Sequence, residues 1–273
     1  MAYIIFDLDE TLLNDERKIA PYTLKVMKKL QSMGHVIVPN TARSKQFAQE
    51  FLDALQPDFA ILNGGTLIID KDEQVLLCHA LDVPTSRALI DELLPVAEEI
   101  NVQTEQGMYS HMGRYTGQNA VAIDLKNEPF DFPLLKVIAK MEDEKAAQKI
   151  ADKFDLEFTS YFGQAFRRYN KRGGTKANAN RMLMEKLGGS LEDVISFGDD
   201  LGDLEMLQQA GIGVLMINAQ EEHHGKVAVM SEYSNNEDGV ARFLVKHFGL
   251  DMEAPVAGSK QNCSPSDLAG KVI

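Results

Sequence analysis

The fold of this chain is decided by residues 3–11, YIIFDLDET. The four leading apolar residues form an unbroken run, which is typical of a strand that is buried on both faces of a parallel sheet. The run stops at Asp7, and Asp9 follows after a single intervening residue. Two carboxylates this close repel each other unless a proton or a cation neutralises them. The segment therefore predicts a strand that delivers acidic side chains to a divalent-metal site.

The segment after this strand alternates between helix and strand. Apolar residues recur at helical spacing over residues 23–33, and Gly34 is placed to end that helix. The further elements predicted are strands over 35–38 and 59–62, a helix between them that stops at Pro57, and a hairpin of strands 66–70 and 75–80. Parallel strands need a connection long enough for a helix, so this alternation predicts a parallel sheet with a ligand site at its carboxyl edge.

The alternation is interrupted from residue 81 to residue 171. This stretch predicts a helix after Pro84, strands near 100–104, 121–125 and 135–139, a helix over 143–154 and further strands up to residue 169. The first pattern then resumes with a helix after Gly174, a strand over 194–197, a helix from about residue 203 and a strand over 212–216. We therefore predict an α/β fold with a Rossmann-like parallel-sheet core (1–80 and 172–250), an inserted α+β domain (81–171) and a tail (251–273).

The composition is that of an ordinary globular protein. Hydrophobic residues make up 44%, charged residues make up 25%, and the formal net charge is −13. That charge repels nucleic acid and anionic lipid, so we expect neither as a partner. No apolar stretch approaches the roughly 18 residues that span a bilayer, and a signal-peptide pattern is absent, so we expect a cytoplasmic protein. Cys78 and Cys263 have neither metal-binding nor disulfide-framework spacing.

Three further polar clusters follow predicted strands or begin predicted helices. The Thr41 hydroxyl can bind a phosphoryl oxygen, or it can belong to an ordinary helix N-cap. Lys176 is either a surface lysine or a cation recruited to a helix start by bound phosphate, since the helix dipole alone disfavours it there. Residues 196–203, SFGDDLGD, place three carboxylates within five positions after an apolar strand. An acidic pair in isolation is usually a solvated turn, but Asp199 stands after its strand where Asp7 stands after its own, so a shared cation is predicted.

These motifs together resemble a known family. DLDET at 7–11, NTAR at 40–43, Lys176 and GDDLGD at 198–203 resemble the haloacid dehalogenase superfamily. The α+β insertion after the third strand resembles the cap of its Cof-like, class IIB branch, and further matches lie at 63–65, 217–219 and 234–240. The resemblance covers residues 1 to about 248.

The resemblance implies roles for individual residues. It implies Asp7 as the nucleophile and Asp9 as the acid and base. It implies that the phosphorylated substrate is bound by Thr41, Ala42, Lys176, Asn63 and Asn218. It implies that Mg²⁺ is held by Asp7, Asp9, Asp199 and Asp203. These roles suit a chemistry in which an aspartyl-phosphate intermediate divides one difficult displacement into two easier ones.

The function implied is a magnesium-dependent phosphatase for small phosphorylated metabolites, such as a sugar phosphate or a phosphorylated cofactor, in a monomer or small homo-oligomer. Asp9 favours a phosphatase over a dehalogenase, because a halide leaves without a proton whereas an alkoxide needs an acid. The alternatives are a phosphotransferase or phosphomutase of the same branch, and a non-catalytic regulator that binds phosphorylated metabolites. A receiver-type signalling module fits less well, because the nucleophile candidate follows the first strand.

Two positions depart from the family pattern. Ala42 replaces a usual glycine, and Gly202 replaces a usual asparagine near the metal site, which puts the roles of Asp200 and Asp203 in doubt.

In the inserted domain His111, Arg114 and Tyr115 are candidates for contacting the leaving group. They can equally belong to a polar, solvated loop.

Overall fold

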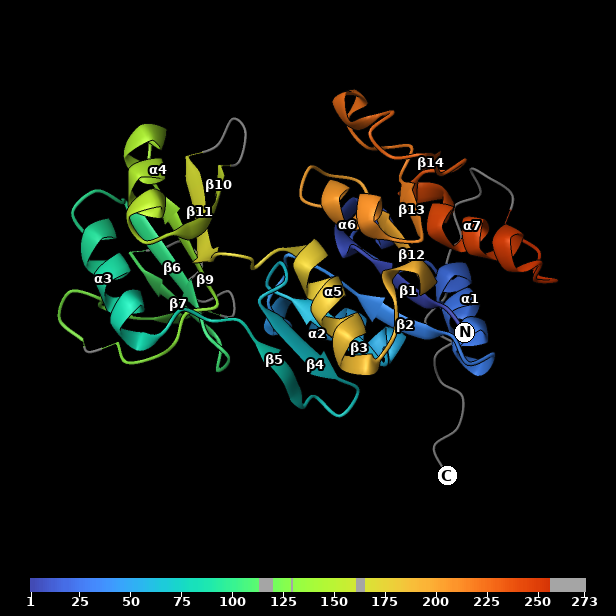
Figure 1. Cartoon of the computed structure of the whole chain (residues 1–273), viewed down its shortest axis with the longest axis horizontal. Helices are drawn as coiled ribbons and strands as arrows, with labels where there is room; N and C mark the ends of the chain where they lie inside the picture. Colours follow the sequence, from blue (N-terminus) through green and yellow to red (C-terminus); the bar gives the residue numbers. More distant parts are fainter. Residues whose placement is uncertain (113–119, 129, 161–164, 256–273) are drawn as a thin grey trace.

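The computed structural model describes residues 1–112, 120–128, 130–160 and 165–255. A five-stranded parallel sheet lies beside a six-stranded sheet that is built from the middle of the chain (Figure 1). The predicted α/β class with an additional α+β sheet is confirmed. Within the described ranges, no helix is long and apolar enough to cross a lipid bilayer.

The parallel sheet has the strand order β14-β13-β12-β1-β2. Its strands are β1 (Tyr3–Phe6), β2 (Val36–Pro39), β12 (Val194–Gly198), β13 (Ile212–Leu215) and β14 (Val229–Met230). The register places Phe6 beside Pro39 on one side and Phe197 on the other. Because the strands are parallel, the residues that follow β1, β2 and β12 meet at one edge of the sheet.

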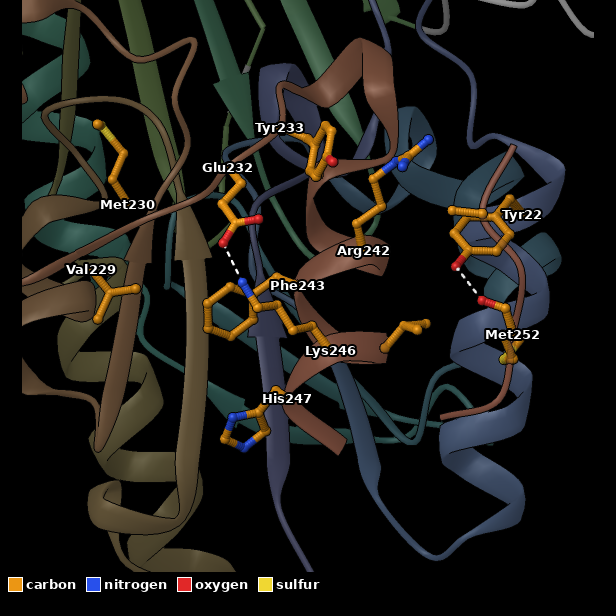
Figure 2. A pocket seen from close by; sticks show the side chains of 13 residues that line it. Tyr22, Val229, Met230, Glu232, Tyr233, Arg242, Phe243, Lys246, His247 and Met252 are labelled. Carbon is orange, nitrogen blue, oxygen red and sulfur yellow. Dashed lines mark hydrogen bonds and ion pairs between the residues drawn. The ribbon is translucent and has the colours of Figure 1, made fainter. Parts of the chain in front are cut away.

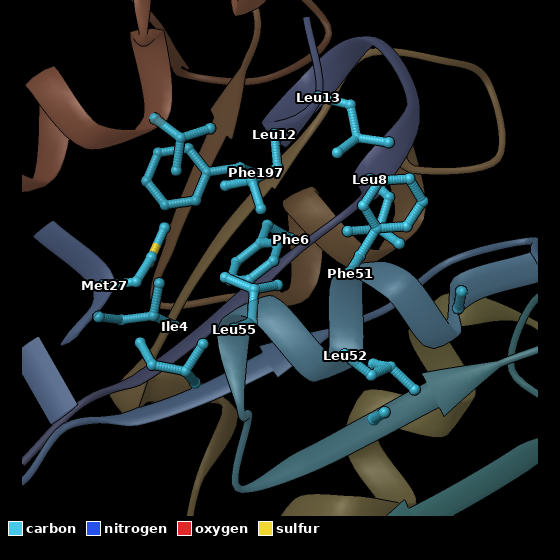
Figure 3. Packing of buried hydrophobic residues seen from close by; sticks show 14 of the residues in the cluster. Ile4, Phe6, Leu8, Leu12, Leu13, Met27, Phe51, Leu52, Leu55 and Phe197 are labelled. Carbon is cyan, nitrogen blue, oxygen red and sulfur yellow. The ribbon is translucent and has the colours of Figure 1, made fainter. Parts of the chain in front are cut away.

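Helices cover both faces of this sheet. On one face lie α1 (Pro21–Ser32), α2 (Lys45–Leu55) and α7 (Gly239–Phe248), and on the other lies α5 (Lys176–Leu187), with α6 (Leu204–Gln209) beside it. Ile4 and Phe6 pack into the first cluster (Figure 3), whereas Tyr3 and Ile5 pack against α5. The apolar run in β1 is therefore explained by burial on both faces, which contributes roughly 1.5–3 kcal/mol for each large side chain.

A three-stranded sheet continues the core beyond β2. It has the order β3-β4-β5 and contains β3 (Phe59–Leu62), β4 (Leu67–Asp70) and β5 (Val75–Cys78). A parallel bridge between Asn40 and Ile61 joins it to the end of β2. The predicted third strand and hairpin are confirmed.

The six-stranded sheet has the order β10-β11-β9-β6-β7-β8. Its strands are β6 (Glu99–Gln103), β7 (Met108–His111), β8 (Ala120–Ala122), β9 (Lys136–Lys140), β10 (Leu156–Ser160) and β11 (Phe166–Lys171). Helices α3 (Val83–Leu93) and α4 (Glu144–Lys153) pack with the apolar residues of one face, among them Val102, Val137 and Tyr169. We refer to residues 81–171 as the cap, and these domain boundaries stay a prediction.

Several predicted elements differ in detail from the structure. Helix α1 begins at Pro21, two residues before the predicted start, because the fixed φ of proline suits the first turn of a helix. The predicted strand over 121–125 is the shorter β8. Strand β7 was not predicted, because its sequence MYSH is neither an apolar run nor a clear alternation. The tight helical turn Leu8–Leu12, which follows the nucleophile candidate, was also not predicted.

Candidate active site

The candidate site begins where β1 ends. The main-chain N–H of Asp7 still donates to the Phe197 carbonyl at 3.1 Å, so Asp7 is held by the sheet. Its buried carboxylate accepts a hydrogen bond from the Leu8 N–H at 2.7 Å. The chain then turns sharply through residues 8–12. The Asp7 carboxylate is therefore fixed at the carboxyl edge of the sheet by backbone contacts.

A second carboxylate follows β12, and a third stands at the start of α6. Asp199 is buried and accepts a hydrogen bond from the Thr11 hydroxyl at 2.6 Å. Asp203 is fully buried and accepts from the Asp199 N–H at 3.0 Å. Asp7, Asp199 and Asp203 each place one oxygen within 4.8 Å of the others. The tertiary structure thus brings together carboxylates that are almost 200 positions apart in the sequence.

Lys176 connects two of these carboxylates. Its Nζ lies 2.7 Å from Asp7 Oδ2 and 2.6 Å from Asp203 Oδ1. Lys176 is the first residue of α5, and Asn40 Nδ2 donates to its main-chain carbonyl at 3.0 Å. The two carboxylates offset the unfavourable helix dipole at this position. Because Lys176 is buried, it is not the solvated surface lysine that the sequence left open.

The charges of this group do not balance. Burial raises the pKa of Asp7 to about 7, against the lowering effect of Lys176, and it raises the pKa of Asp199 to about 8. Burial also raises the pKa of Asp203. Burial opposes the charge on Lys176, but Asp203 and Asp7 outweigh it and raise the pKa of the lysine, which keeps its proton. Three ionised carboxylates and one ammonium leave a net charge of −2, which a divalent cation would balance.

The donor set suits Mg²⁺. Small hard cations prefer carboxylate oxygens, and all three side chains offer them. In the part of the chain that the structure describes, this is the one group of three potential metal-ligating side chains that lie this close together. Asp9, which was predicted as a further ligand, does not place its side chain in this group.

Asp9 is held by Arg43 instead. Arg43 Nε lies 2.8 Å from Asp9 Oδ2, and Nη2 lies 2.6 Å from Oδ1. The guanidinium also stacks over the Phe51 ring at 4.9 Å, and its hydrogen bond with Asp9 raises the Arg43 pKa. The Asp9 side chain remains 47% exposed. The Asp9 carboxylate is therefore partly open to solvent and held in a fixed orientation, and its role as acid and base stays a prediction. The sequence placed Arg43 in the NTAR motif but gave it no role.

The predicted phosphate-binding residues after β2 and β3 lie in two adjoining loops. Thr41 is fully buried, and its hydroxyl accepts from the Arg43 N–H at 3.2 Å. The Gly64 N–H donates to the Thr41 carbonyl at 2.9 Å, which ties the two loops together. Asn63 has a left-handed backbone with φ of 56°, and among the described residues its buried Oδ1 has no hydrogen-bond partner. Its substrate role, like that of Thr41, stays a prediction.

Two other predicted residues are used by neighbouring loops. Asn218 Nδ2 donates to the Glu10 carbonyl at 2.8 Å, and its Oδ1 accepts from the Asn235 N–H at 3.1 Å, so it supports the turn after Asp9. His111 lies on β7, where its Nδ1 accepts from the Leu125 N–H at 3.3 Å. Arg114 and Tyr115 lie outside the described residues.

One departure from the family pattern, Gly202, lies in a hydrogen-bonded turn after β12. Gly202 donates its N–H to Asp200 Oδ1 at 2.7 Å, and a Cβ at this position would lie 3.1 Å from that oxygen. A side chain at this position would have to displace that oxygen slightly, and Asp200 itself is exposed and lies outside the group of three carboxylates. Asp203, by contrast, contacts both the lysine and the Asp199 backbone.

A cap residue that the sequence did not single out also reaches this region. Lys136 on β9 is 3% exposed, and its Nζ donates to the Ala42 carbonyl at 2.7 Å. The only signal for it was a lysine among the apolar residues of the strand predicted over 135–139. A separate cavity of 630 Å³ lies between β14 and α7 (Figure 2) and is lined by none of the carboxylates described above.

Comparison with known proteins identifies the family of this chain. The model of the haloacid dehalogenase-like hydrolase family matches residues 4–244. A 5-amino-6-(5-phospho-D-ribitylamino)uracil phosphatase of Bacillus subtilis is 27% identical over 266 residues, covering 90% of this chain and 97% of that protein. A pyridoxal phosphate phosphatase of Escherichia coli is 24% identical over 269 residues, covering 89% and 97%.

The fold is shared with solved structures. A sugar phosphatase described as subclass IIB of the superfamily superposes with a TM-score of 0.73 at 20% identity, covering 91% of this chain and 99% of that one. That likeness confirms the fold expected for the class IIB branch. The family match spans all the motifs from Asp7 to Asp203. The chain therefore belongs to the haloacid dehalogenase-like hydrolase family.

Proposed function

We propose that this enzyme is a magnesium-dependent phosphatase that releases inorganic phosphate from small phosphorylated metabolites. The observation that carries the proposal is the buried group of Asp7, Lys176, Asp199 and Asp203 at the carboxyl edge of β1. The relatives named above for a phosphorylated ribitylaminouracil and for pyridoxal phosphate support the reaction type and the substrate class, which includes sugar phosphates and phosphorylated cofactors.

In the first step Asp7 attacks the phosphorus atom. An Asp7 oxygen forms the new P–O bond while the bond to the leaving oxygen breaks, which gives an aspartyl-phosphate. Lys176, already 2.7 Å from Asp7, and the Thr41 hydroxyl would share the negative charge of the transferring group. Asp9 donates its proton to the leaving oxygen, and Arg43 keeps that carboxyl group pointed at the open side of the site.

In the second step water attacks the phosphorus atom of the aspartyl-phosphate. Asp9, now ionised, takes a proton from the water, and the bond between phosphorus and the Asp7 oxygen breaks. Inorganic phosphate leaves, and both carboxylates return to their starting state.

Asp7, Asp199 and Asp203 are the side chains that would hold Mg²⁺. Asp203 already accepts hydrogen bonds from the N–H groups of Asp199 and Asp200, whereas Asp7 and Asp199 accept none from this turn. When bound, Mg²⁺ would supply positive charge that offsets the repulsion between an anionic nucleophile and an anionic substrate. Thr11 orients Asp199 for this task through its 2.6 Å hydrogen bond.

The test is release of inorganic phosphate from a panel of sugar phosphates and phosphorylated cofactors, with Mg²⁺ and with chelator. We expect turnover that requires Mg²⁺ and that disappears in Asp7→Asn. The matched control is Asp91→Asn, an exposed residue of α3. A folded wild-type protein that binds Mg²⁺ but releases no phosphate from any ester would refute the proposal. Transfer of the phosphoryl group to a second sugar, without free phosphate, would indicate a phosphotransferase.

A further inference from the structure

The cap sheet has two unlike faces. Val102, Val137 and Tyr169 pack into the apolar cluster with α3 and α4. Side chains alternate between faces along a strand, so Lys136 and its register partner Gln103 lie on the opposite face. Arg168 pairs with Ile138, two residues along from Lys136, and therefore shares this face. Gln103 and Lys136 are only 5% and 3% exposed, so this polar face is covered at its core-facing end.

Lys136 crosses from the cap to the core. Its Nζ contacts the Ala42 carbonyl at 2.7 Å, one residue from Thr41 and one from the arginine that holds Asp9. Burial, together with the positive charges of Arg168 and Lys176, lowers the pKa of Lys136 to about 7. The lysine therefore lies among cations, close to the loop that borders the candidate site.

Arg168 is a second cap residue that reaches the core, where it approaches the loop after β3. A Cβ on Gly64 would lie 2.9 Å from Arg168 Nη1, so the guanidinium packs directly against this glycine. The Arg168 Nε is buried and, among the described residues, has no hydrogen-bond partner. Asn63, beside Gly64, likewise has a buried side-chain oxygen without a partner there. Gly64 has a left-handed backbone with φ of 74°, which favours glycine, and a side chain here would also shift the end of the arginine.

Neither cap cation is compensated by a carboxylate in the described part of the chain. None of the ion pairs found there includes Lys136 or Arg168, although the protein carries a net charge of −13. Burying an unpaired charge is costly unless a partner of opposite sign arrives. The reacting phosphate has its own cation in Lys176, so the two cap cations are available to a different part of the substrate.

We propose that Lys136 and Arg168 form a second anion-binding site, which selects phosphate esters whose leaving group carries another anionic group, a carboxylate or a phosphate. This inference rests on the proposed phosphatase function and adds the substrate class. The site lies where the cap meets the loops after β2 and β3, which border the open side that Asp9 faces. A leaving group bound there would have its ester oxygen on the side of the site that Asp9 faces, where Asp9 can protonate it.

The test compares matched substrates on the complete enzyme. Glycerol phosphate and phosphoglycerate share a carbon skeleton and differ in a carboxylate, and a hexose monophosphate and its bisphosphate differ in a phosphate. We expect wild-type kcat/KM to favour the anionic member by about 10- to 100-fold, the range of one or two charge-assisted hydrogen bonds. The pair with the larger preference identifies which anion the site takes.

The variants are Lys136→Met and Arg168→Met, with Lys136→Arg as the conservative rescue. We expect each Met variant to reduce that preference about tenfold or more, mainly through KM, and Lys136→Arg to retain most of it. The control is Lys140→Met on the same strand, whose Nζ pairs with Glu98 at 2.5 Å on the exposed part of the sheet. A wild type without preference, or a preference unchanged in folded Met variants, would overturn the inference.

A binding measurement separates this inference from the proposed function. Calorimetric titration of Asp7→Asn with phosphoglycerate and with glycerol phosphate needs no turnover. If no ester is hydrolysed but phosphoglycerate binds more tightly and Lys136→Met removes the difference, the phosphatase proposal fails and the anion site stands. Equal affinities for the two ligands would refute the proposed anion site even if the enzyme proves to be an active phosphatase.

Discussion

Replacing Lys176 with methionine tests the charge balance on which the site is built. The side chain is 8% exposed and contacts Asp7 at 2.7 Å and Asp203 at 2.6 Å. Removing one partner of a buried ion pair while the other stays buried costs about 3–5 kcal/mol. In a chain of this size each kcal/mol lowers Tm by roughly 2–4 °C, so we expect Tm to fall by roughly 6–20 °C. The carboxylates can take up protons instead, so the loss should be larger at about pH 8 than at about pH 5, since the Asp7 pKa is raised to about 7.

Thermal unfolding followed by circular dichroism, in chelator and at both pH values, measures this effect. The control is Lys186→Met, an exposed lysine in the last turn of the same helix. Mg²⁺ should raise Tm more in Lys176→Met than in the wild type, because the variant carries one more uncompensated negative charge. A folded variant that melts at the wild-type temperature at about pH 8, or that loses equal stability at both pH values, would refute this account of the site.

The remaining predictions concern the metal, the acid and the pH dependence. Thr11→Val removes the hydroxyl that donates to Asp199, so calorimetry should show Mg²⁺ affinity lower by about 10- to 100-fold; an unchanged affinity would contradict the orienting role. Arg43→Met frees the Asp9 carboxylate from its two hydrogen bonds, and steady-state kinetics should show kcat lower by about 100-fold with a smaller change in KM; equal kcat would mean that Arg43 does not orient the acid. In chelator, the free energy of unfolding should fall as pH rises from about 4 to about 8, because the raised pKa values of Asp7 and Asp199 mean that the folded state binds more protons than the unfolded state. Denaturant titrations across this pH range measure the effect, and saturating Mg²⁺ should flatten the dependence of unfolding free energy on pH. A free energy of unfolding that rose with pH in chelator would contradict the argument.

Local sequence patterns were sufficient to predict the strands and helices of the core. The apolar run of β1 predicts a strand buried on both faces, and its abrupt end at Asp7 marks the edge of the sheet where the carboxylates meet. The position of Asp199 after β12 repeats that pattern, and both carboxylates are brought together as parallel-strand topology predicts. Such features are readable because each depends on residues that are neighbours in the chain.

The contacts between side chains that are distant in the sequence became known only from the tertiary structure. The pairing of Arg43 with Asp9, the burial of Lys176 between Asp7 and Asp203, and the approach of Arg168 to the core all join residues from different strands and loops. No local periodicity encodes which side chains meet when they lie 27 or more positions apart in the sequence, as all of these pairs do. Sequence patterns alone predict a parallel-sheet core with acidic strand ends. Which cations surround those carboxylates depends on tertiary packing: Lys176 and Arg43 reach them from other core elements, and the cap sheet brings Lys136 and Arg168 to the neighbouring loops. Such contacts depend on the relative placement of separate elements, which no single segment encodes.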